Sequence, residues 1–259
     1  MRRSGRAAPR LLAALIAAAI ALPAARAENG FPDVVDRIRP AIVGIGTWQA
    51  TRRPPASLEG TGFVVGDGTI VATNAHVVAR DLDGAQRERR VIFVGRGRQP
   101  EMRGVTLRAR DDEHDLAILA IEGAPLPALR LAGDDAPREG EDVAFTGFPI
   151  GAVLGLYPVT HQGSVSAITP IVIPARASRE LSAAQVVALR DPYDVLQLDA
   201  TAYPGNSGSP VYRRDTGAVI GVINQVMVKG KKESALSDPS GITYAIPVRY
   251  LRELLERSP

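Results

Sequence analysis

Short runs of apolar residues recur along the chain from residue 41 to residue 246, and glycine, proline and aspartate separate them. Valine, isoleucine and threonine dominate these runs, as is typical of strands. Many short strands with turn residues between them indicate an all-β domain, either a barrel or a sandwich, and not a fold of alternating strands and helices. The predicted strands are Ala41–Trp48, Gly60–Val65, Thr69–Thr73, Val91–Val94, Val105–Ala109, Leu116–Ile121, Val143–Thr146, Val159–Ile168, Val195–Leu198, Pro210–Tyr212, Val219–Ile223 and Ile242–Ile246.

The predicted strands fall into two halves of similar size. A stretch rich in proline and glycine, residues 123–140, separates a first half of about residues 33–125 from a second half of about residues 140–246. The pattern changes at residues 247–257, where a proline suits the first helical position and three leucines form an apolar stripe. The sequence therefore predicts a C-terminal helix after the second half.

The first 27 residues differ from the rest of the chain. Four arginines precede an apolar run from Leu11 to Leu22, and Ala25-Arg26-Ala27 follows it. This order is that of a secretory signal peptide with a small-x-small cleavage site. The apolar run is short for a membrane span, which needs about 20 residues. We interpret residues 1–27 as a cleaved signal peptide and expect an exported bacterial protein, periplasmic or secreted, without a stable membrane anchor.

Charge and cysteine content exclude several function classes. The whole chain has 31 basic and 28 acidic residues, but five of the arginines lie in residues 1–27, so residues 28–259 carry 26 basic and 28 acidic residues. The basic excess thus belongs to the signal segment, and no nucleic-acid partner is predicted. The absence of cysteine excludes a thiolate nucleophile, and the three histidines lack the spacing of a zinc site. We expect no metal and no cofactor.

Three stretches carry residue types used in nucleophilic catalysis. Residues 203–210 place Ser207 between two glycines, where a tight turn exposes a hydroxyl and aims N–H groups at one point. His76 directly follows one predicted strand, and Asp115 directly precedes another. Taken singly, each residue also suits a turn or a strand end. In combination, the chain order His, Asp, Ser is that of the chymotrypsin class, and not that of α/β-hydrolases or subtilisins.

At these residues the sequence resembles a trypsin-like serine protease, most closely the bacterial HtrA/Deg type. The resemblance covers about residues 33–250 and implies two antiparallel six-stranded β-barrels with the active site in the cleft between them. The sequence departs from the family at Ser209, where glycine is usual, and it shows no PDZ domain after the protease domain. The matching segments are Gly60-Thr-Gly-Phe-Val-Val, Thr73-Asn-Ala-His-Val-Val, Asp115-Leu-Ala-Ile-Leu, Gly163-Ser-Val-Ser-Ala, Pro204-Gly-Asn-Ser-Gly and Gly241-Ile-Thr-Tyr-Ala-Ile-Pro.

The resemblance implies a serine endopeptidase of proteins or peptides, unfolded ones among them, in HtrA-like quality control. In the implied triad, Ser207 attacks the carbonyl, His76 transfers the proton and Asp115 orients the imidazole. The N–H groups of Gly205 and Ser207 would form the oxyanion hole. The alternative is a catalytically silent relative that binds exposed peptide segments, with an oxyanion loop altered by Ser209. The sequence makes no prediction of the oligomeric state.

The resemblance also indicates a substrate pocket at Thr201, Ala202, Gln225 and Val226. Thr201 stands where a trypsin-type enzyme carries an acid, so a buried lysine or arginine would lack a partner there. We therefore expect a preference for small or medium aliphatic P1 residues, namely Ala, Val, Leu and Ile. A pocket for glutamate would need a basic or histidine partner, for which His161 is the candidate.

The remaining polar residues near these stretches are interpreted as structural. His114 neighbours the candidate aspartate and points to the opposite face of the strand. Ser209 is interpreted as a turn residue, and Asp199 as a cap or turn acid. Asp111 and Asp112 are interpreted as solvated loop acids.

Overall fold

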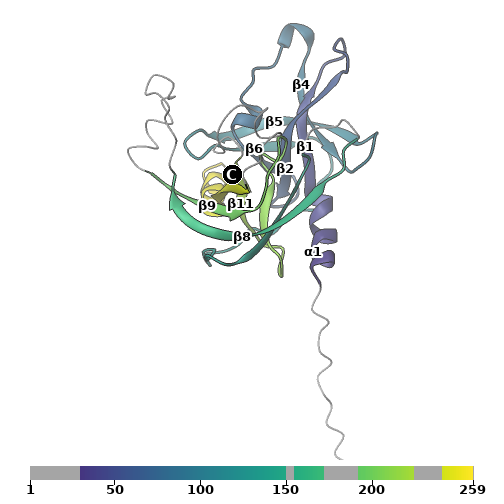
Figure 1. Cartoon of the computed structure of the whole chain (residues 1–259). Helices are drawn as coiled ribbons and strands as arrows, with labels where there is room; N and C mark the ends of the chain where they lie inside the picture. The colour runs from purple at the N-terminus through teal and green to yellow at the C-terminus, as the bar shows by residue number, and fades with distance from the viewer. Residues whose placement is uncertain (1–29, 150–154, 172–191, 225–240, 259) are drawn as a thin grey trace, which may run out of the picture.

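The computed structural model describes residues 30–149, 155–171, 192–224 and 241–258 (Figure 1). The expected fold class is confirmed, because the strands form two closed barrels of six antiparallel strands and a helix follows the last strand. The signal-peptide interpretation of residues 1–27 and the pocket positions Gln225 and Val226 fall outside the described residues.

The first barrel (barrel 1) carries the candidate histidine and aspartate. Its strands are joined in the order β1-β2-β3-β6-β5-β4, and each neighbouring pair is antiparallel. Helix α1, Phe31–Ile38, precedes the barrel and buries Val34, Val35 and Ile38. The strands are β1 Ile42–Trp48, β2 Ala56–Val65, β3 Ile70–Thr73, β4 Arg89–Val94, β5 Glu101–Asp111 and β6 Leu116–Ile121.

The second barrel (barrel 2) carries the candidate serine. Its strands are joined in the order β10-β11-β12-β9-β8-β7, again with antiparallel neighbours. The long strand β8 curves across the lower part of the molecule in Figure 1. The strands are β7 Asp142–Gly147, β8 Val159–Pro170, β9 Asp194–Asp199, β10 Pro210–Arg213, β11 Val219–Ile223 and β12 Ile242–Pro247.

Several observed strands are longer than the predicted apolar runs, because they continue into polar residues at one end. Strand β5 begins at Glu101 and β8 ends at Pro170, and both of these end residues are exposed. Backbone pairing continues there without side-chain burial, as where Glu101 pairs with Val94. A search for apolar runs detects the buried part of a strand and misses such ends.

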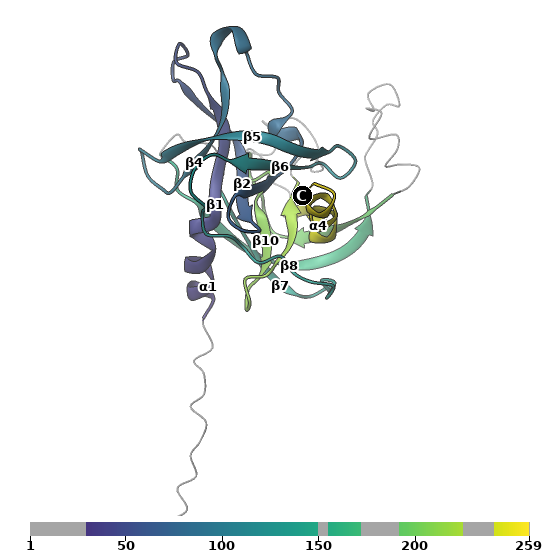
Figure 2. The same ribbon diagram turned by 180° about the vertical axis from the view of Figure 1, so that it is seen from behind.

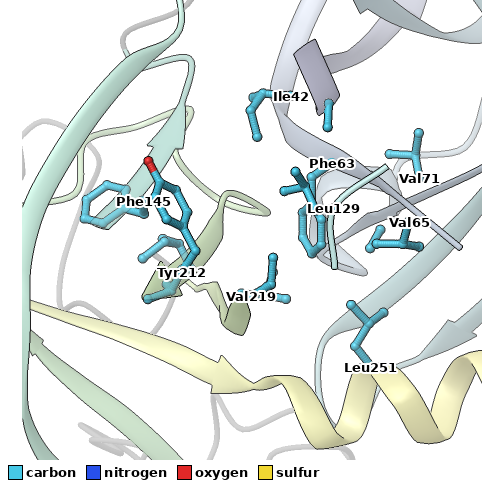
Figure 3. Packing of buried hydrophobic residues seen from close by; sticks show 14 of the residues in the cluster. Ile42, Phe63, Val65, Val71, Leu129, Phe145, Tyr212, Val219 and Leu251 are labelled. Atoms are coloured by element: carbon cyan, nitrogen blue, oxygen red, sulfur yellow. The ribbon is translucent and has the colours of Figure 1, made fainter. Parts of the chain in front are cut away.

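The two barrels share one hydrophobic core. Figure 3 shows side chains of barrel 1, such as Phe63, facing side chains of barrel 2, such as Tyr212, across Leu129 and Val219. Leu129 belongs to the segment that links the barrels, and its N–H donates to the Val64 carbonyl of β2 at 2.9 Å. The same segment pairs with β11 through a bridge to Val219. The link therefore fixes the barrels relative to one another, which is required for a site built from both.

Helix α4, Val248–Glu256, returns from barrel 2 to barrel 1. It contacts β11 and β12 of its own barrel and β5 and β6 of barrel 1. The reverse view in Figure 2 shows the helix beneath β6. Leu251 and Leu254 are buried, which confirms the predicted apolar stripe. Within the described residues, no helix has both the length and the apolar character needed to cross a membrane.

Candidate active site

Asp115 and His76 are in direct contact at the edge of barrel 1. His76 Nδ1 lies 2.6 Å from Asp115 Oδ2, and the backbone N–H of His76 donates to Asp115 Oδ1 at 2.8 Å. Both side chains are partly buried, with 31% of His76 and 21% of Asp115 exposed. One carboxylate accepts from both the ring and the backbone of the same histidine, and these two bonds fix the orientation of the imidazole. Asp115 binds Nδ1, so the other ring nitrogen, Nε2, is not held by this carboxylate.

The backbone of Asp115 is held in an uncommon conformation. Its φ is +52°, in the left-handed region that residues other than glycine rarely adopt. The Asp115 carbonyl accepts from the Asn74 side chain at 3.0 Å and from the Ala75 N–H at 3.1 Å. These bonds join the turn before β6 to the segment that carries His76, and they stabilise the strained backbone where the carboxylate is needed.

Asn224 of barrel 2 is a third partner of the Asp115 carboxylate, and sequence reasoning missed it. Its Nδ2 donates to Asp115 Oδ2 at 2.8 Å, and Asn224 is buried. Asn224 directly follows β11, whose Ile223 carbonyl accepts from the N–H of Gly208 in the serine turn. The strand end that holds the aspartate therefore also holds the turn that carries Ser207.

The turn around Ser207 packs tightly on barrel 1. Gly205 and Gly208 have φ values of +101° and +84°. A Cβ on Gly208 would lie 2.1 Å from the Thr61 carbonyl oxygen and 2.4 Å from Thr73 Oγ1, so only glycine fits. The Ser207 carbonyl accepts from the Thr61 N–H at 2.9 Å. Because Thr73 precedes His76 by three residues, these contacts bring the serine turn beside the histidine segment.

Gly60 lies between the serine turn and the histidine segment. A Cβ on Gly60 would lie 2.8 Å from both Val77 methyl groups and 3.2 Å from the Ser207 carbonyl oxygen. Val77 is the neighbour of His76, so the two segments approach one another across this single backbone position. All three predicted chemical residues thus lie in one region between the barrels.

Two backbone amides of the serine turn are without an acceptor among the described residues. Among the hydrogen bonds of the described residues, neither the Gly205 nor the Ser207 N–H donates to another group. The Gly205 carbonyl is held by Thr61 Oγ1 at 2.7 Å, which restricts rotation of the adjoining peptide. The Asn206 N–H donates to the Tyr203 carbonyl at 2.9 Å and closes the turn.

Ser209, the residue that departs from the family pattern, points toward barrel 2. It is fully buried, and its Oγ would lie 2.0 Å from a Cβ on Gly147, the last residue of β7. The Ser209 hydroxyl therefore occupies the space that a side chain at position 147 would need. Sequence reasoning treated Ser209 as a turn residue and did not detect this pairing.

The predicted pocket positions that the structure describes are Thr201 and Ala202. Both are partly buried, and the Ala202 N–H donates to Thr243 Oγ1 at 3.0 Å. Thr243 Oγ1 in turn donates to the Ala200 carbonyl at 2.7 Å, and the residue is almost fully buried in β12. The threonine thus anchors the segment that precedes the serine turn.

His161, the candidate partner for a glutamate pocket, packs inside barrel 2. Its ring stacks on Phe145 with centroids 4.7 Å apart, and burial lowers the pKa of the imidazole. The centroid of the Tyr203 ring lies 5.9 Å from that of His161. Because burial favours its neutral form, His161 is a poor partner for a substrate carboxylate.

The interpretation of Asp111 as a solvated loop acid was wrong. Asp111 ends β5 with only 10% of its side chain exposed, and it accepts from His114 Nδ1 at 2.9 Å. The His114 ring stacks on Tyr250 of α4, with centroids 3.9 Å apart. Asp111 and His114 therefore connect helix α4 to barrel 1, which confirms that His114 is structural.

No group of three or more His, Asp or Glu residues within the described parts of the chain is arranged to hold a metal ion. The arrangement offers a hydroxyl, an imidazole fixed by a carboxylate, and two amide donors beside the hydroxyl.

Comparison with known proteins agrees with this arrangement. Residues 60–222 match the description of a trypsin-like peptidase domain. The mitochondrial serine protease HTRA2 of Bos taurus is 32% identical over 257 residues, which cover 98% of this chain and 48% of the relative. The serine protease HTRA1A of Danio rerio is 31% identical over 235 residues, which cover 89% of this chain and 41% of the relative. The chain thus spans less than half the length of these curated relatives.

Solved structures show the same fold. The structure described as HtrA-type protease AlgW with tripeptide has a TM-score of 0.61 and 25% identity, with 88% of this chain and 62% of that chain covered. A serine endoprotease from Yersinia pestis has a TM-score of 0.62 and 22% identity, with 88% of this chain and 66% of that chain covered. At that identity the second structure supports the fold alone.

Proposed function

The chain belongs to the trypsin-like peptidase family, and from that premise we propose that it is a serine endopeptidase with His76, Asp115 and Ser207 as its catalytic triad. The observation that carries the proposal is the 2.6 Å contact between His76 Nδ1 and Asp115 Oδ2, on a histidine segment packed against the Ser207 turn. Such a contact sets the tautomer that a general base requires, with Nε2 unprotonated.

In the proposed mechanism, Ser207 Oγ attacks the peptide carbonyl while His76 Nε2 accepts its proton. Asp115 stabilises the imidazolium that forms, and the carbonyl oxygen takes on negative charge between the Gly205 and Ser207 N–H groups. His76 then donates the proton to the leaving amine, and the acyl chain stays on Ser207. Water, activated by the same imidazole, hydrolyses this acyl-enzyme in the second half of the reaction.

The substrates in this proposal are proteins, unfolded ones among them, cleaved outside the cytoplasm after removal of residues 1–27. The named serine proteases among the relatives support the activity, and the charged and apolar N-terminal segment supports export. The substrate pocket at Thr201 and Ala202 takes small or medium aliphatic P1 residues. No formal charge lies in the segment from residue 200 to residue 210.

The catalytically silent alternative rested on an oxyanion loop altered by Ser209. Ser209 is buried against Gly147 and donates its backbone N–H to the Asn206 carbonyl at 2.9 Å. Its hydroxyl therefore lies against Gly147 of β7, and neither the Gly205 nor the Ser207 N–H donates to Ser209. This geometry favours the enzyme.

Labelling with a fluorophosphonate probe tests the proposal. The mature chain should form a covalent adduct with Ser207, detected by mass spectrometry of the labelled peptide, and Ser207→Ala should not react. The same variant should lose hydrolysis of casein by several orders of magnitude, because triad residues act as a unit. Cleavage that persists in Ser207→Ala above about a tenth of the wild-type rate would exclude Ser207 as the nucleophile.

A further inference from the structure

Barrel 1 carries an apolar cavity outside the candidate active site. Its volume is about 510 Å³, and its lining includes the side chains of Trp48, Leu58, Phe93, Met102 and Leu156. Ligand sites are typically concave, mostly apolar and about 300–1,000 Å³ in volume. None of the residues assigned to catalysis lines this cavity.

The sequence of β1 explains the wall of the cavity. Gly44 and Gly46 alternate with Ile45 and Thr47, which are fully buried. A Cβ on Gly44 would lie 2.7 Å from Leu58 Cδ1, and one on Gly46 would lie 2.9 Å from Phe93 Cε2. Side chains of β2 and β4 therefore lie directly on the bare backbone of β1, and this close packing makes the wall rigid.

Barrel 2 closes one side of the cavity. Gly97, in the turn between β4 and β5, exchanges two backbone hydrogen bonds with Leu156, of 2.7 and 2.8 Å. The Leu156 side chain is buried, and its Cδ2 would lie 3.1 Å from a Cβ on Gly44. The cavity thus lies where the two barrels meet, which is a preferred place for ligand sites.

Strand β2 connects the cavity to the candidate active site. Thr61 of β2 donates its N–H to the Ser207 carbonyl, and Gly60 packs against Val77, next to His76. The strand is buried from Gly60 onward and partly exposed from residue 56 to residue 59. Its accessible direction therefore leads from the active site to Leu58. At about 3.3 Å per residue, Leu58 lies roughly 10 Å along the strand from Thr61.

This direction corresponds to the leaving-group side of a substrate. His76 donates its proton to the leaving amine, so the part of the substrate after the scissile bond lies on the side of His76. The pocket positions Thr201 and Ala202 lie on the acyl side, anchored to β12. An extended chain also advances about 3.3 Å per residue. The third to fifth substrate residues after the scissile bond would therefore lie next to the cavity.

The charge at the rim indicates an acidic partner. Arg98 lines the cavity and is exposed, and Arg89 lies over the Trp48 ring, 4.8 Å from its centroid. Neither arginine forms a salt bridge with any residue that the structure describes. Among the described residues, no acidic side chain lines the cavity. An apolar group with a carboxylate next to it would complement both the cavity and its rim.

We propose that this cavity is a docking site for the substrate itself, and that it binds an aromatic or large aliphatic residue with an acidic neighbour at the third to fifth positions after the scissile bond. The proposal rests on the proposed peptidase function. Docking in the cavity would add a selectivity that the P1 pocket does not provide. Substrates with the same P1 residue would be cleaved at different rates, depending on their residues after the scissile bond.

Two internally quenched peptides with the same residues around the scissile bond test the proposal. The long peptide continues with Asp, Glu and Phe at the third to fifth positions, whereas the short peptide ends after the second. Wild-type enzyme should cleave the long peptide with about tenfold higher kcat/KM, which corresponds to about 1.4 kcal/mol. Cleavage of the short peptide reports the peptidase function independently of docking.

Arg98→Glu and Met102→Asp change exposed side chains of the cavity. Each should reduce the ratio of long to short kcat/KM to below about twofold. A long peptide with Lys in place of Asp and Glu should lose its advantage in wild type and regain it in Arg98→Glu. The control is Arg108→Glu, the same charge reversal at an exposed position of β5, about 20 Å along the strand from Met102.

Three results would overturn the docking site and leave the peptidase intact. They are equal rates for the two peptides in wild type, a tenfold advantage that survives Arg98→Glu, and an equal loss of the advantage in Arg108→Glu. Failure of the proposed function would look different, since wild type would then cleave neither peptide.

Discussion

Asn224 Nδ2 donates a hydrogen bond of 2.8 Å to Asp115 Oδ2, the same carboxylate oxygen that lies 2.6 Å from His76 Nδ1. The acid of barrel 1 is thus oriented by a residue of barrel 2. Asn224 also follows the strand that binds the Ser207 turn through the Ile223 carbonyl. The alignment of the proposed triad therefore depends on the junction between the barrels as well as on each barrel.

Removal of the Asn224 amide tests this dependence. In Asn224→Ala the partly buried Asp115 carboxylate loses one charged hydrogen bond, worth about 1.5–3 kcal/mol. We expect kcat to fall about tenfold to a hundredfold, with a smaller change in KM, because Asn224 acts through Asp115. Steady-state kinetics on a short peptide measures both parameters. A circular dichroism melt checks that the variant folds, and an unchanged kcat in the folded variant would contradict the positioning role.

Ser209, which directly precedes β10, and Gly147, the last residue of β7, form a second pair. A Cβ on Gly147 would lie 2.0 Å from Ser209 Oγ. We therefore expect Gly147→Ala to lower the free energy of unfolding by about 1–3 kcal/mol, as overpacking does. Combining it with Ser209→Gly should restore part of the loss, and urea unfolding of the four proteins gives the coupling energy. Additive effects of the two substitutions would show that the side chains do not compete for this space.

The buried parts of the strands could be predicted from the sequence, and the three candidate chemical residues, which stay a prediction, were selected from local segments. Apolar runs mark buried strands, and His76, Asp115 and Ser207 each lie in a recognisable segment. Asn224 was missed because nothing near it in the chain indicates a contact with Asp115, 109 residues away. The Ser209–Gly147 pair is likewise invisible locally, because the two residues meet only after the barrel closes.

Asp111 shows the same limit in a charged residue. Among the acids of residues 111–115 it was interpreted as solvated, because no apolar run follows it directly. Its burial depends on two residues near the C-terminal end of the chain. Tyr250 stacks on His114, the hydrogen-bond partner of Asp111, and Arg257 donates to Asp111 Oδ2. Long-range packing decides whether such an acid is a loop residue or part of the core.

The buried carboxylate of Glu88 is expected to contribute strongly to stability. Only 1% of its side chain is exposed, and its Oε1 accepts from Arg80 at 2.7 Å and from Arg52 at 2.8 Å. The Arg80 guanidinium in particular holds the pKa of Glu88 well below its usual range. Glu88→Gln removes the carboxylate partner of Arg52 and leaves Arg80 with Glu59 alone, and we expect a loss of about 2–3 kcal/mol.

Thermal unfolding measures this loss as a decrease in Tm of about 5–10 °C for a chain of this size. The matched control is Glu101→Gln, whose side chain is 58% exposed and pairs with Arg103. An exposed pair of this kind is worth less than about 1 kcal/mol. An equal decrease in Tm for the two substitutions would contradict the claim that the burial of Glu88 makes its ion pairs more stabilising than an exposed pair.

Asp111 predicts a specific dependence of stability on pH. Burial raises the pKa of its carboxyl, but the hydrogen bonds from His114 and the charge of Arg257 outweigh burial and lower it to about 2. A pKa lowered from 3.8 stabilises the fold above about pH 4, and that stabilisation is lost as the pH falls toward 2. Wild type should therefore exceed Asp111→Asn by about 2 kcal/mol near neutral pH and converge with it at low pH.

Urea unfolding at several pH values between about 6 and about 2.5 measures this convergence. Asp112→Asn is the control, because 61% of the Asp112 side chain is exposed and Arg110 is its only ion-pair partner among the described residues. A constant difference between wild type and Asp111→Asn across the range would refute the pKa argument.

The P1 preference gives the last prediction, and it depends on Thr201. The segment before the serine turn is pinned by Thr243, which accepts from Ala202 and donates to Ala200. Without a carboxylate at position 201, a buried Lys or Arg would lack a partner, so sequenced products of an unfolded protein should end mainly in Ala, Val, Leu or Ile. Each methylene is worth only about 1–3 kcal/mol, so the preference should be broad.

Thr201→Asp should shift the cuts toward Lys and Arg, and the neutral control Thr201→Asn should not. Wild-type cuts mainly after Arg, Lys or Glu would contradict an aliphatic pocket, and an unchanged pattern in Thr201→Asp would remove position 201 from its wall.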